Sequence, residues 1–113
     1  MKLSDYVAAR VAELGVRHVF MVTGGGAMHL NHSLGTRPDL KCVFHHHEQA
    51  CAIAAEAYYR VENRLPLVNV TSGPGGTNAI TGVYGAFVDS IGMVVLSGQV
   101  KWETTVRSTG LPL

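Results

Sequence analysis

The sequence is poor in charge and lacks both long apolar runs and basic clusters, and each deficit excludes a class of function. Only 15% of its 113 residues are charged and the formal net charge is +1, so nucleic acid is not an expected partner. No segment reaches the roughly 18 consecutive apolar residues that a membrane-spanning helix requires. The N-terminus also lacks the apolar segment of a secretory signal peptide. We therefore expect a cytoplasmic protein without membrane contacts.

Cysteine is scarce as well. The sequence has two cysteines, Cys42 and Cys51, and they belong to no paired-thiol motif. Without a secretory signal, a structural disulfide is not expected. Because 47% of the residues are hydrophobic, the chain has enough apolar side chains for a packed core. We expect both cysteines to be reduced and buried in it.

Short apolar runs alternate with helix-forming segments along the chain. The first predicted helix has Ser4 or Asp5 as its cap and buries one stripe of side chains: Tyr6, Val7, Val11 and Leu14. The predicted helices cover residues 5–14, 27–34, 47–61 and 77–88, and the predicted strands cover 16–22, 40–44, 67–70 and 91–97. This alternation predicts an α/β fold with a parallel sheet and helices on both faces. Residues 99–113 lose all periodicity, so the fold is expected to be incomplete at its C-terminal end.

Two glycine-rich loops follow the first and third strands, at the carboxyl ends where open α/β sheets bind ligands. In the first loop, Gly24-x-Gly26-x-x-His29 lacks the third glycine of a dinucleotide fingerprint. A nucleotide site is therefore a minor alternative, and a tight turn that brings backbone amides near another ligand is favoured.

In the second loop, Ser72 lacks the glycine two residues earlier that a nucleophile elbow requires. Its hydroxyl is expected to support the turn or cap the next helix. Gly73, Pro74 and Gly75 are expected to form a rigid loop. Thr77 and Asn78 are expected to cap the helix behind it.

Three consecutive histidines, His45, His46 and His47, suggest a metal site. A zincin-type site requires a second histidine four residues after His47, and that position is Cys51. No other ligand occurs at a recognisable spacing. We therefore expect His45 and His46 to end a strand and His47 to begin a helix.

Glu48 follows these histidines at the predicted first turn of an alanine-rich helix. Its small and apolar neighbours would keep it partly dry, which disfavours its charged form, whereas the helix N-terminus favours that form. A carboxyl group balanced in this way suits proton exchange with a ligand nitrogen. The alternative is an ordinary first-turn glutamate.

Four segments together resemble the acetolactate-synthase-like family of thiamine-diphosphate enzymes, at the start of their pyrimidine-binding domain. They are Gly15–Phe20, His47–Tyr58, Thr71–Asn78 and Ser97–Val100, in the order and at the spacing of the family. The resemblance extends over essentially the whole chain and implies a thiamine-diphosphate-binding fold. It also implies that Glu48 hydrogen-bonds N1′ of the cofactor's aminopyrimidine, which promotes loss of the thiazolium C2 proton. The cofactor then reacts with a 2-oxo acid such as pyruvate, in decarboxylation or carboligation.

The same resemblance implies roles for both loops. Gly73, Pro74 and Gly75 would approach the cofactor, and Asn78 would hold that turn. A second group of residues would line the substrate pocket: Gly24, Gly25, Gly26, Ala27, His47 and Gln99.

The sequence departs from the family in one respect. The family binds diphosphate and Mg²⁺ through a Gly-Asp-Gly motif in a separate domain, and no Gly-Asp pair occurs here. We therefore expect residues 1–113 to be the N-terminal part of a pyrimidine-binding domain, without the central domain, which binds FAD in some relatives, or the diphosphate domain. The expected assembly is a homodimer or homotetramer with the active site between subunits. The alternative is a truncated, non-catalytic domain that serves as a binding or assembly module.

Overall fold

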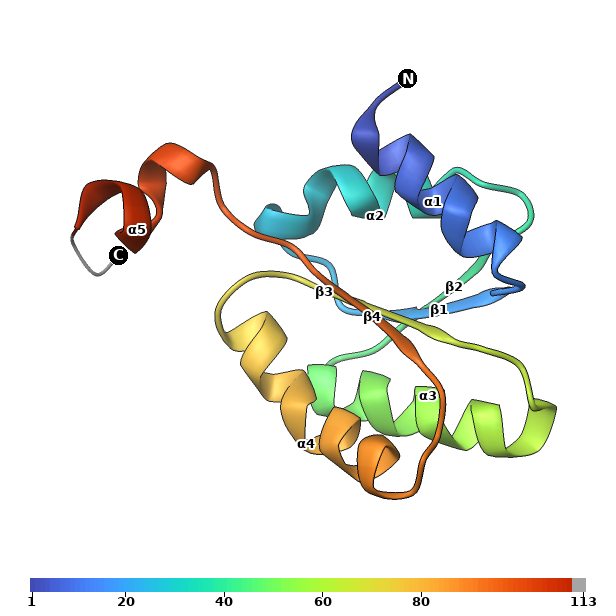
Figure 1. The fold of residues 1–113 in the computed structure, drawn as a ribbon. Helices are drawn as coiled ribbons and strands as arrows, with labels where there is room; N and C mark the ends of the chain where they lie inside the picture. Colours follow the sequence, from blue (N-terminus) through green and yellow to red (C-terminus); the bar gives the residue numbers. More distant parts are fainter. Residues whose placement is uncertain (111–113) are drawn as a thin grey trace.

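The computed structural model describes residues 1–110, and this part of the chain folds into three layers (Figure 1). The central sheet has four parallel strands in the order β2-β1-β3-β4: β1 (His18–Met21), β2 (Lys41–Phe44), β3 (Leu67–Val70) and β4 (Val94–Ser97). Helices α1 (Leu3–Glu13) and α2 (Met28–Gly35) cover one face of the sheet, and α3 (Glu48–Glu62) and α4 (Pro74–Val88) cover the other. The predicted α/β class and parallel sheet are confirmed.

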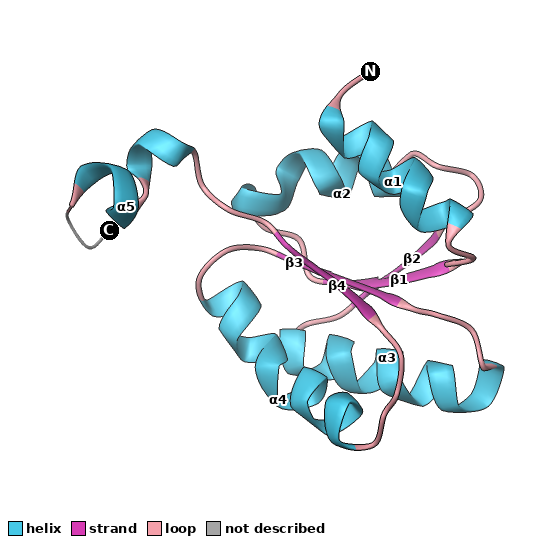
Figure 2. Ribbon diagram, in the orientation of Figure 1, coloured by secondary structure: helices cyan, strands magenta, loops and turns pink. Residues whose placement is uncertain are grey.

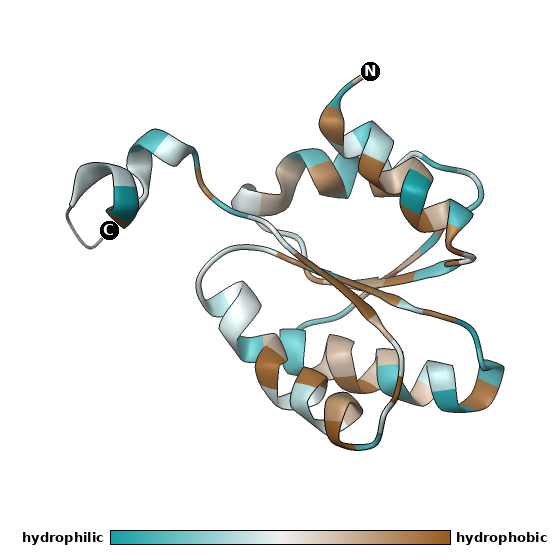
Figure 3. Ribbon diagram, in the orientation of Figure 1, coloured by the Kyte–Doolittle hydropathy of each residue, from teal (hydrophilic) through white to brown (hydrophobic). Residues whose placement is uncertain are grey.

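The sheet separates two hydrophobic clusters. Leu67 of β3 packs with Val11 and Leu34 beneath α1 and α2, whereas Val68 and Val70 face the side of α3 and α4. All four residues of β3 are buried, as expected for an inner parallel strand covered on both faces. Figure 3 shows the strands as the most continuously hydrophobic part of the chain. Burial of these apolar side chains is the main force that holds the helices on the sheet.

Helix α1 differs from its prediction in both cap and buried stripe. It begins at Leu3, two residues earlier than predicted, with Lys2 at the N-cap, and the side that it buries consists of Ser4, Ala8, Val11 and Ala12. Tyr6 and Leu14 are 50% and 59% exposed, so their predicted burial is wrong. Ser4 and Asp5 both bind α2: Ser33 Oγ lies 2.8 Å from Ser4 Oγ and 2.7 Å from Asp5 Oδ1. Asp5 also contributes to the helix start, because its Oδ2 accepts from the Lys2 backbone N–H at 3.3 Å. The hydrogen bond from Ser33 lowers the pKa of Asp5.

Helix α4 begins at Pro74 rather than at the predicted Thr77. Gly73 is the N-cap residue and has φ of +58°, a conformation that glycine adopts without strain and that turns the chain directly into the helix. Proline is favoured at the first helical position because its missing N–H has no helical partner there. Thr77 and Asn78 therefore lie inside the helix, and their predicted capping role is wrong.

The turn that ends α4 makes the last strand shorter than predicted, because β4 begins at Val94 and not at residue 91. Ile91 N–H donates to Ala86 O at 2.8 Å, so Ile91 belongs to the turn that ends α4 and not to β4. Asn63 ends α3 in the left-handed conformation, with φ of 50°. Such a residue closes the last helical turn and lets the chain reverse toward β3.

The C-terminal segment is more regular than predicted. A short 3₁₀ helix, η2 (Trp102–Thr104), and α5 (Val106–Thr109) follow β4 and lie away from the three layers (Figure 2). The prediction of an irregular segment is thus wrong for residues 102–109, and residues 111–113 of that prediction lie outside the described range. Among residues 1–110, none of the helices combines the length and the apolar character needed to cross a membrane.

Helices α3 and α4 approach each other closely at Gly82. A Cβ atom at this position would lie 2.5 Å from Ala52 Cβ and 3.0 Å from the Ile53 backbone nitrogen. One helical turn further on, a Cβ atom at Gly85 would lie 3.5 Å from Glu56 Oε2, which is an ordinary contact. The spacing between the two helices is therefore set by a glycine facing a small alanine.

These two glycines provide a matched pair of substitutions. We expect Gly82→Ala to lower the free energy of unfolding by about 1–3 kcal/mol, because the added methyl group forces the helices apart. Gly85→Ala should instead raise it by about 0.5–1 kcal/mol, since it replaces glycine within a helix without a clash. Urea unfolding of the two variants measures both values, and equal effects would contradict the close helix packing.

Candidate functional site

The carboxyl end of the sheet contains the crevice at which open α/β sheets bind ligands. Strands β1 and β3 are neighbours, but the loop after β1 leads to α2 on one face and the loop after β3 leads to α4 on the other (Figure 1). Open α/β sheets bind ligands outside the carboxyl ends of the strands, at a reversal of this kind. Helix α3 also begins at this end of the sheet, directly after β2.

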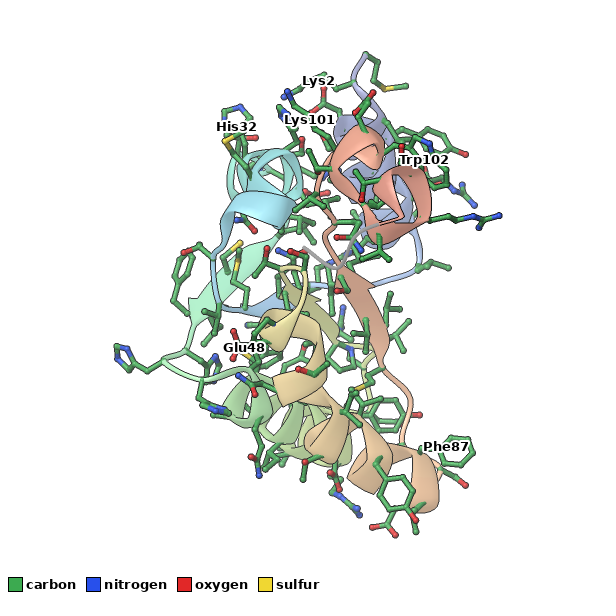
Figure 4. The ribbon with its side chains drawn as sticks, turned by 90° about the vertical axis from the view of Figure 1, so that its left-hand side faces the viewer. Lys2, His32, Glu48, Phe87, Lys101 and Trp102 are labelled. Carbon is green, nitrogen blue, oxygen red and sulfur yellow. The ribbon has the colours of Figure 1, made fainter. Side chains whose placement is uncertain are left out.

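Glu48 is the first residue of α3, and its carboxylate is held by α4. Asn78 Nδ2 donates to Glu48 Oε2 at 3.2 Å, which joins the first turns of the two helices. Within residues 1–110, Glu48 Oε1 accepts no hydrogen bond, and the side chain is only half-buried. Glu48 lies beside the first turns of α3 and α4 in Figure 4. One carboxylate oxygen is thus fixed by protein, and the other can bind a ligand.

The loop after β3 lies against this carboxylate. A Cβ atom at Gly75 would lie 2.6 Å from Thr71 Cγ2 and 3.8 Å from Glu48 Oε1, so a larger residue at Gly75 would displace Thr71. Gly75 N–H donates to Ser72 O at 3.2 Å, which closes the turn. At Gly73, in contrast, a Cβ atom would meet nothing within 4 Å. The structure therefore brings Glu48, Gly75 and Asn78 together and leaves Gly73 facing open space.

The loop after β1 packs against the loop after β3. A Cβ atom at Gly24 would lie 2.5 Å from Thr71 Cβ, and one at Gly26 would lie 2.9 Å from Thr71 Oγ1. A Cβ atom at Gly25 would meet nothing within 4 Å, whereas the side chain of Ala27 is buried. Of the predicted pocket residues in this loop, Gly25 faces open space, and Gly24 and Gly26 permit close contact between the loops.

The three consecutive histidines have different environments and do not form a common site. His45 Nδ1 lies 3.2 Å from Val43 O and its ring packs on Phe20 at 5.9 Å. His46 is exposed, and His47 is the N-cap of α3, where its Nδ1 accepts from the Gln49 backbone N–H at 3.0 Å. In the described part of the chain, no three His, Cys, Asp or Glu side chains gather as metal ligands would.

Gln99 lines two cavities. Its Oε1 accepts from the Val100 backbone N–H at 2.9 Å. One cavity, of about 400 Å³, lies against the loop after β1 and is also lined by Lys101. The other, of about 520 Å³, lies against Gly73 and is also lined by Arg107. Sequence reasoning missed Lys101 and Arg107, because both lie in a segment with no periodic pattern.

A buried amide pair supports the loop after β1, and no sequence motif indicated it. Asn69 is fully buried in β3, and its Nδ2 donates to Asn31 Oδ1 of α2 at 2.7 Å. Asn31 Nδ2 donates in turn to Gly24 O at 3.4 Å. Asn69 Oδ1 has no hydrogen-bond partner among residues 1–110. The pair connects the central strand to the glycine loop.

Both cysteines are free thiols, as predicted, but only Cys51 is fully buried, since Cys42 is half-buried. Burial, together with the nearby negative charge of Glu48, raises the pKa of the Cys51 thiol to about 11. Burial also raises the pKa of Cys42. Because thiolates are the reactive species, both side chains are expected to be unreactive at neutral pH.

Comparison with known proteins gives one consistent family. Residues 1–109 match the family model described as "Thiamine pyrophosphate enzyme, N-terminal TPP binding domain". The chain is 40% identical over 97 residues to the acetolactate synthase large subunit of Buchnera aphidicola, and 41% identical over 97 residues to the acetolactate synthase isozyme 3 large subunit of Escherichia coli. Each match covers 86% of this chain and 17% of the relative. The chain thus spans about a sixth of the length of these curated relatives.

A solved structure agrees in fold. The X-ray structure of a putative thiamin diphosphate-dependent enzyme from Mycobacterium smegmatis superimposes with a TM-score of 0.82, over 95% of this chain and 20% of that one. The sequence identity of this pair is 20%. The likeness therefore concerns the arrangement of the strands and helices.

The raised pKa of Cys51 predicts a loss of stability at alkaline pH. The folded state holds the thiol proton more tightly than the unfolded state, so stability falls as pH rises above the unfolded value of 9.0 toward about 11. Between about pH 8 and about pH 10, we expect wild type to lose about 1 kcal/mol more than Cys51→Ala. Urea unfolding of both proteins at the two pH values measures this difference. Parallel pH profiles would contradict it.

Proposed function

The chain belongs to the family of thiamine pyrophosphate enzymes, through their N-terminal TPP-binding domain, and from this premise we propose that it binds the cofactor's pyrimidine in an acetolactate-synthase-like enzyme. The proposed substrates are 2-oxo acids such as pyruvate, which undergo decarboxylation or carboligation. The proposed location is the cytoplasm. The observation that carries the proposal is the Glu48 carboxylate, with one oxygen held by Asn78 and the other free among the described residues.

The residues around Glu48 fit an aminopyrimidine. Gly75 keeps the backbone beside Glu48 Oε1 free of a side chain, since a Cβ atom there would lie 3.8 Å from that oxygen, and Gly73 leaves open space on the same loop. Glu48 is also the first residue of the 15-residue helix α3. Asn78 fixes the carboxylate in one orientation. The site therefore offers a carboxyl group that can exchange a proton with a ring nitrogen without first being reoriented.

When bound, thiamine diphosphate supplies an acidic thiazolium carbon that reacts with the carbonyl group of a 2-oxo acid. The proposed role of Glu48 is to hold or release a proton at N1′ of the pyrimidine. Asn78 keeps Glu48 Oε2 in place, so that Oε1 carries out this exchange. Gly25 and Gln99 are proposed to border the substrate. His47 would contribute only the rest of its ring, because its Nδ1 already accepts from the Gln49 backbone N–H.

The remaining parts of the proposed enzyme lie outside this chain. Residues 1–110 contain no cluster of three metal-binding side chains, so Mg²⁺ and the diphosphate are proposed to be bound by another domain. Any FAD is likewise proposed to be bound elsewhere.

We propose that the active enzyme is a homodimer or homotetramer with its active site between subunits. An apolar stripe on α4 supports this, because Ile80, Tyr84, Phe87 and Val88 are between 58% and 78% exposed. Figure 4 shows Phe87 pointing away from the sheet at the end of α4 remote from Glu48. Sedimentation of the complete enzyme should give the mass of a dimer or tetramer, and a fully active monomer would rule the assembly out.

A second candidate is a non-catalytic binding or assembly module, and the observation behind it is that residues 1–113 contain no Gly-Asp pair of a diphosphate-binding motif. Calorimetric titration with thiamine diphosphate separates the two candidates. A module without cofactor would show no binding under any condition. Micromolar binding by the 113-residue chain alone would contradict both the module and the proposed need for another domain.

We expect Glu48→Gln to slow exchange of the C2 proton of bound thiamine diphosphate by about a hundredfold or more, because an amide cannot exchange a proton with N1′. The measurement is quenched hydrogen–deuterium exchange followed by NMR, in the enzyme of which this chain is proposed to form the N-terminal part. Glu62→Gln is the control, since Glu62 lies exposed at the opposite end of the same helix. Exchange at the wild-type rate in Glu48→Gln would refute the proposed role.

A further inference from the structure

The cavity beside Arg107 shares Gly73 and Gln99 with the proposed site, but its charged lining residue, Arg107, has no role above. It measures about 520 Å³ and lies between the loop after β3 and the C-terminal segment. Its polar lining comes from two stretches of chain, residues 72–73 and residues 99–107. Gly73, which borders this cavity, is two residues from Gly75, which borders Glu48. A ligand in the cavity would therefore lie next to the proposed cofactor site.

The cavity is positively charged. Arg107 is the charged residue in its lining, and no Asp or Glu lines it. Three other arginines hold carboxylates: Arg10 binds Glu13, Arg37 binds Asp39, and Arg60 binds both Glu56 and Asp89. Arg17 donates to backbone carbonyls instead, and Arg64 has no ion pair among residues 1–110. Within residues 1–110, Arg107 forms no ion pair and instead lies 5.6 Å from the ring centre of Trp102. The aromatic face restrains the guanidinium without neutralising it.

The remaining polar side chains of the cavity also offer protons. Gln99 Oε1 is used by the Val100 N–H, which leaves the amide NH₂ group as the part of Gln99 that can bind a ligand. The Ser72 hydroxyl donates to no other group in the described range. Thr104 and Thr105 differ, because their hydroxyls already donate to Lys101 O and Trp102 O. The free donors are therefore a guanidinium, an amide and a hydroxyl, which together suit an anion.

We propose that this cavity binds the acid group, carboxylate or phosphate, of an organic acid substrate, with Arg107 as its anchor. The planar guanidinium can donate two parallel hydrogen bonds to either group. As a statement about the reaction, this inference rests on the proposed function, because only there is the acid a substrate. As a statement about binding, it concerns Arg107 alone and does not involve Glu48.

The test is an NMR titration of the ¹⁵N-labelled 113-residue chain with pyruvate, with methyl pyruvate and with inorganic phosphate. Pyruvate should shift the amide signals of Ser72 and Gly73 and the Nε–H signal of Arg107. Methyl pyruvate lacks the charge, so its affinity should be lower than that of pyruvate by about tenfold or more. Binding of inorganic phosphate more tightly than pyruvate would assign the site to a phosphate group, and the reverse would assign it to a carboxylate.

Two arginine variants decide the role of the anchor. Arg107→Gln should weaken acid binding about tenfold or more, because it removes a charged hydrogen-bond donor. Arg64→Gln removes the same charge from an exposed site in the loop before β3, at the opposite end of the sheet, and should change the affinity less than about twofold. Unchanged signals of β1 and β3 verify that both variants are folded.

Equal effects of the two variants would overturn the proposal, as would equal affinity for methyl pyruvate. Shifts centred on Lys101 and Met28, in the neighbouring cavity, would overturn it too. The outcome is independent of the exchange experiment on Glu48. If acid binding fails while Glu48→Gln blocks exchange, only the present inference is lost, and in the opposite case only the proposed function is lost.

Discussion

Three stretches of backbone meet around Thr71 with no space for one additional carbon atom, and the site depends on this contact. A Cβ atom at Gly98 would lie 2.2 Å from Gly26 O, and those at Gly24 and Gly75 would lie 2.5 Å and 2.6 Å from the Thr71 side chain. The loops after β1, β3 and β4 are therefore in direct contact. This contact fixes the first turn of α4, from which Asn78 reaches Glu48. The carboxylate is thus positioned by packing that lies several residues away from it.

Much of this arrangement follows from local patterns in the sequence. The short β-branched runs and the alanine-rich helix are strong signals, and they led directly to the parallel sheet. Glu48 was singled out because it follows a strand at the first turn of a helix, among small and apolar residues. Its proposed role came from the family resemblance, because the residues alone left an ordinary first-turn glutamate as the alternative. The hydrogen bond between Asn78 and Glu48 could not be predicted, because the two residues are 30 positions apart and Asn78 was assigned to a cap.

The parts that sequence reasoning missed depend on contacts between distant segments. In α1, the choice of Tyr6 and Leu14 as buried residues followed their hydrophobicity, whereas the structure turns smaller residues, Ala8 and Ala12, toward the sheet. In the C-terminal segment, helices of three and four residues are too short to show a period. The cavity of Arg107 has a lining from separate loops, so that no single motif could reveal it.

The buried amide of Asn69 also constrains how the chain folds. In β3, Asn69 faces Asn31 of α2, while Val68 and Val70 on either side face the cluster beneath α3 and α4. A shift of β3 by one residue against its neighbours would exchange these faces. It would place an amide among apolar side chains and leave Asn31 without its partner, at a cost of about 1–3 kcal/mol for each unpaired polar group. A polar residue at the centre of the sheet thus destabilises a misregistered β3. A strand of four valines would carry no such penalty, because both of its faces would be apolar.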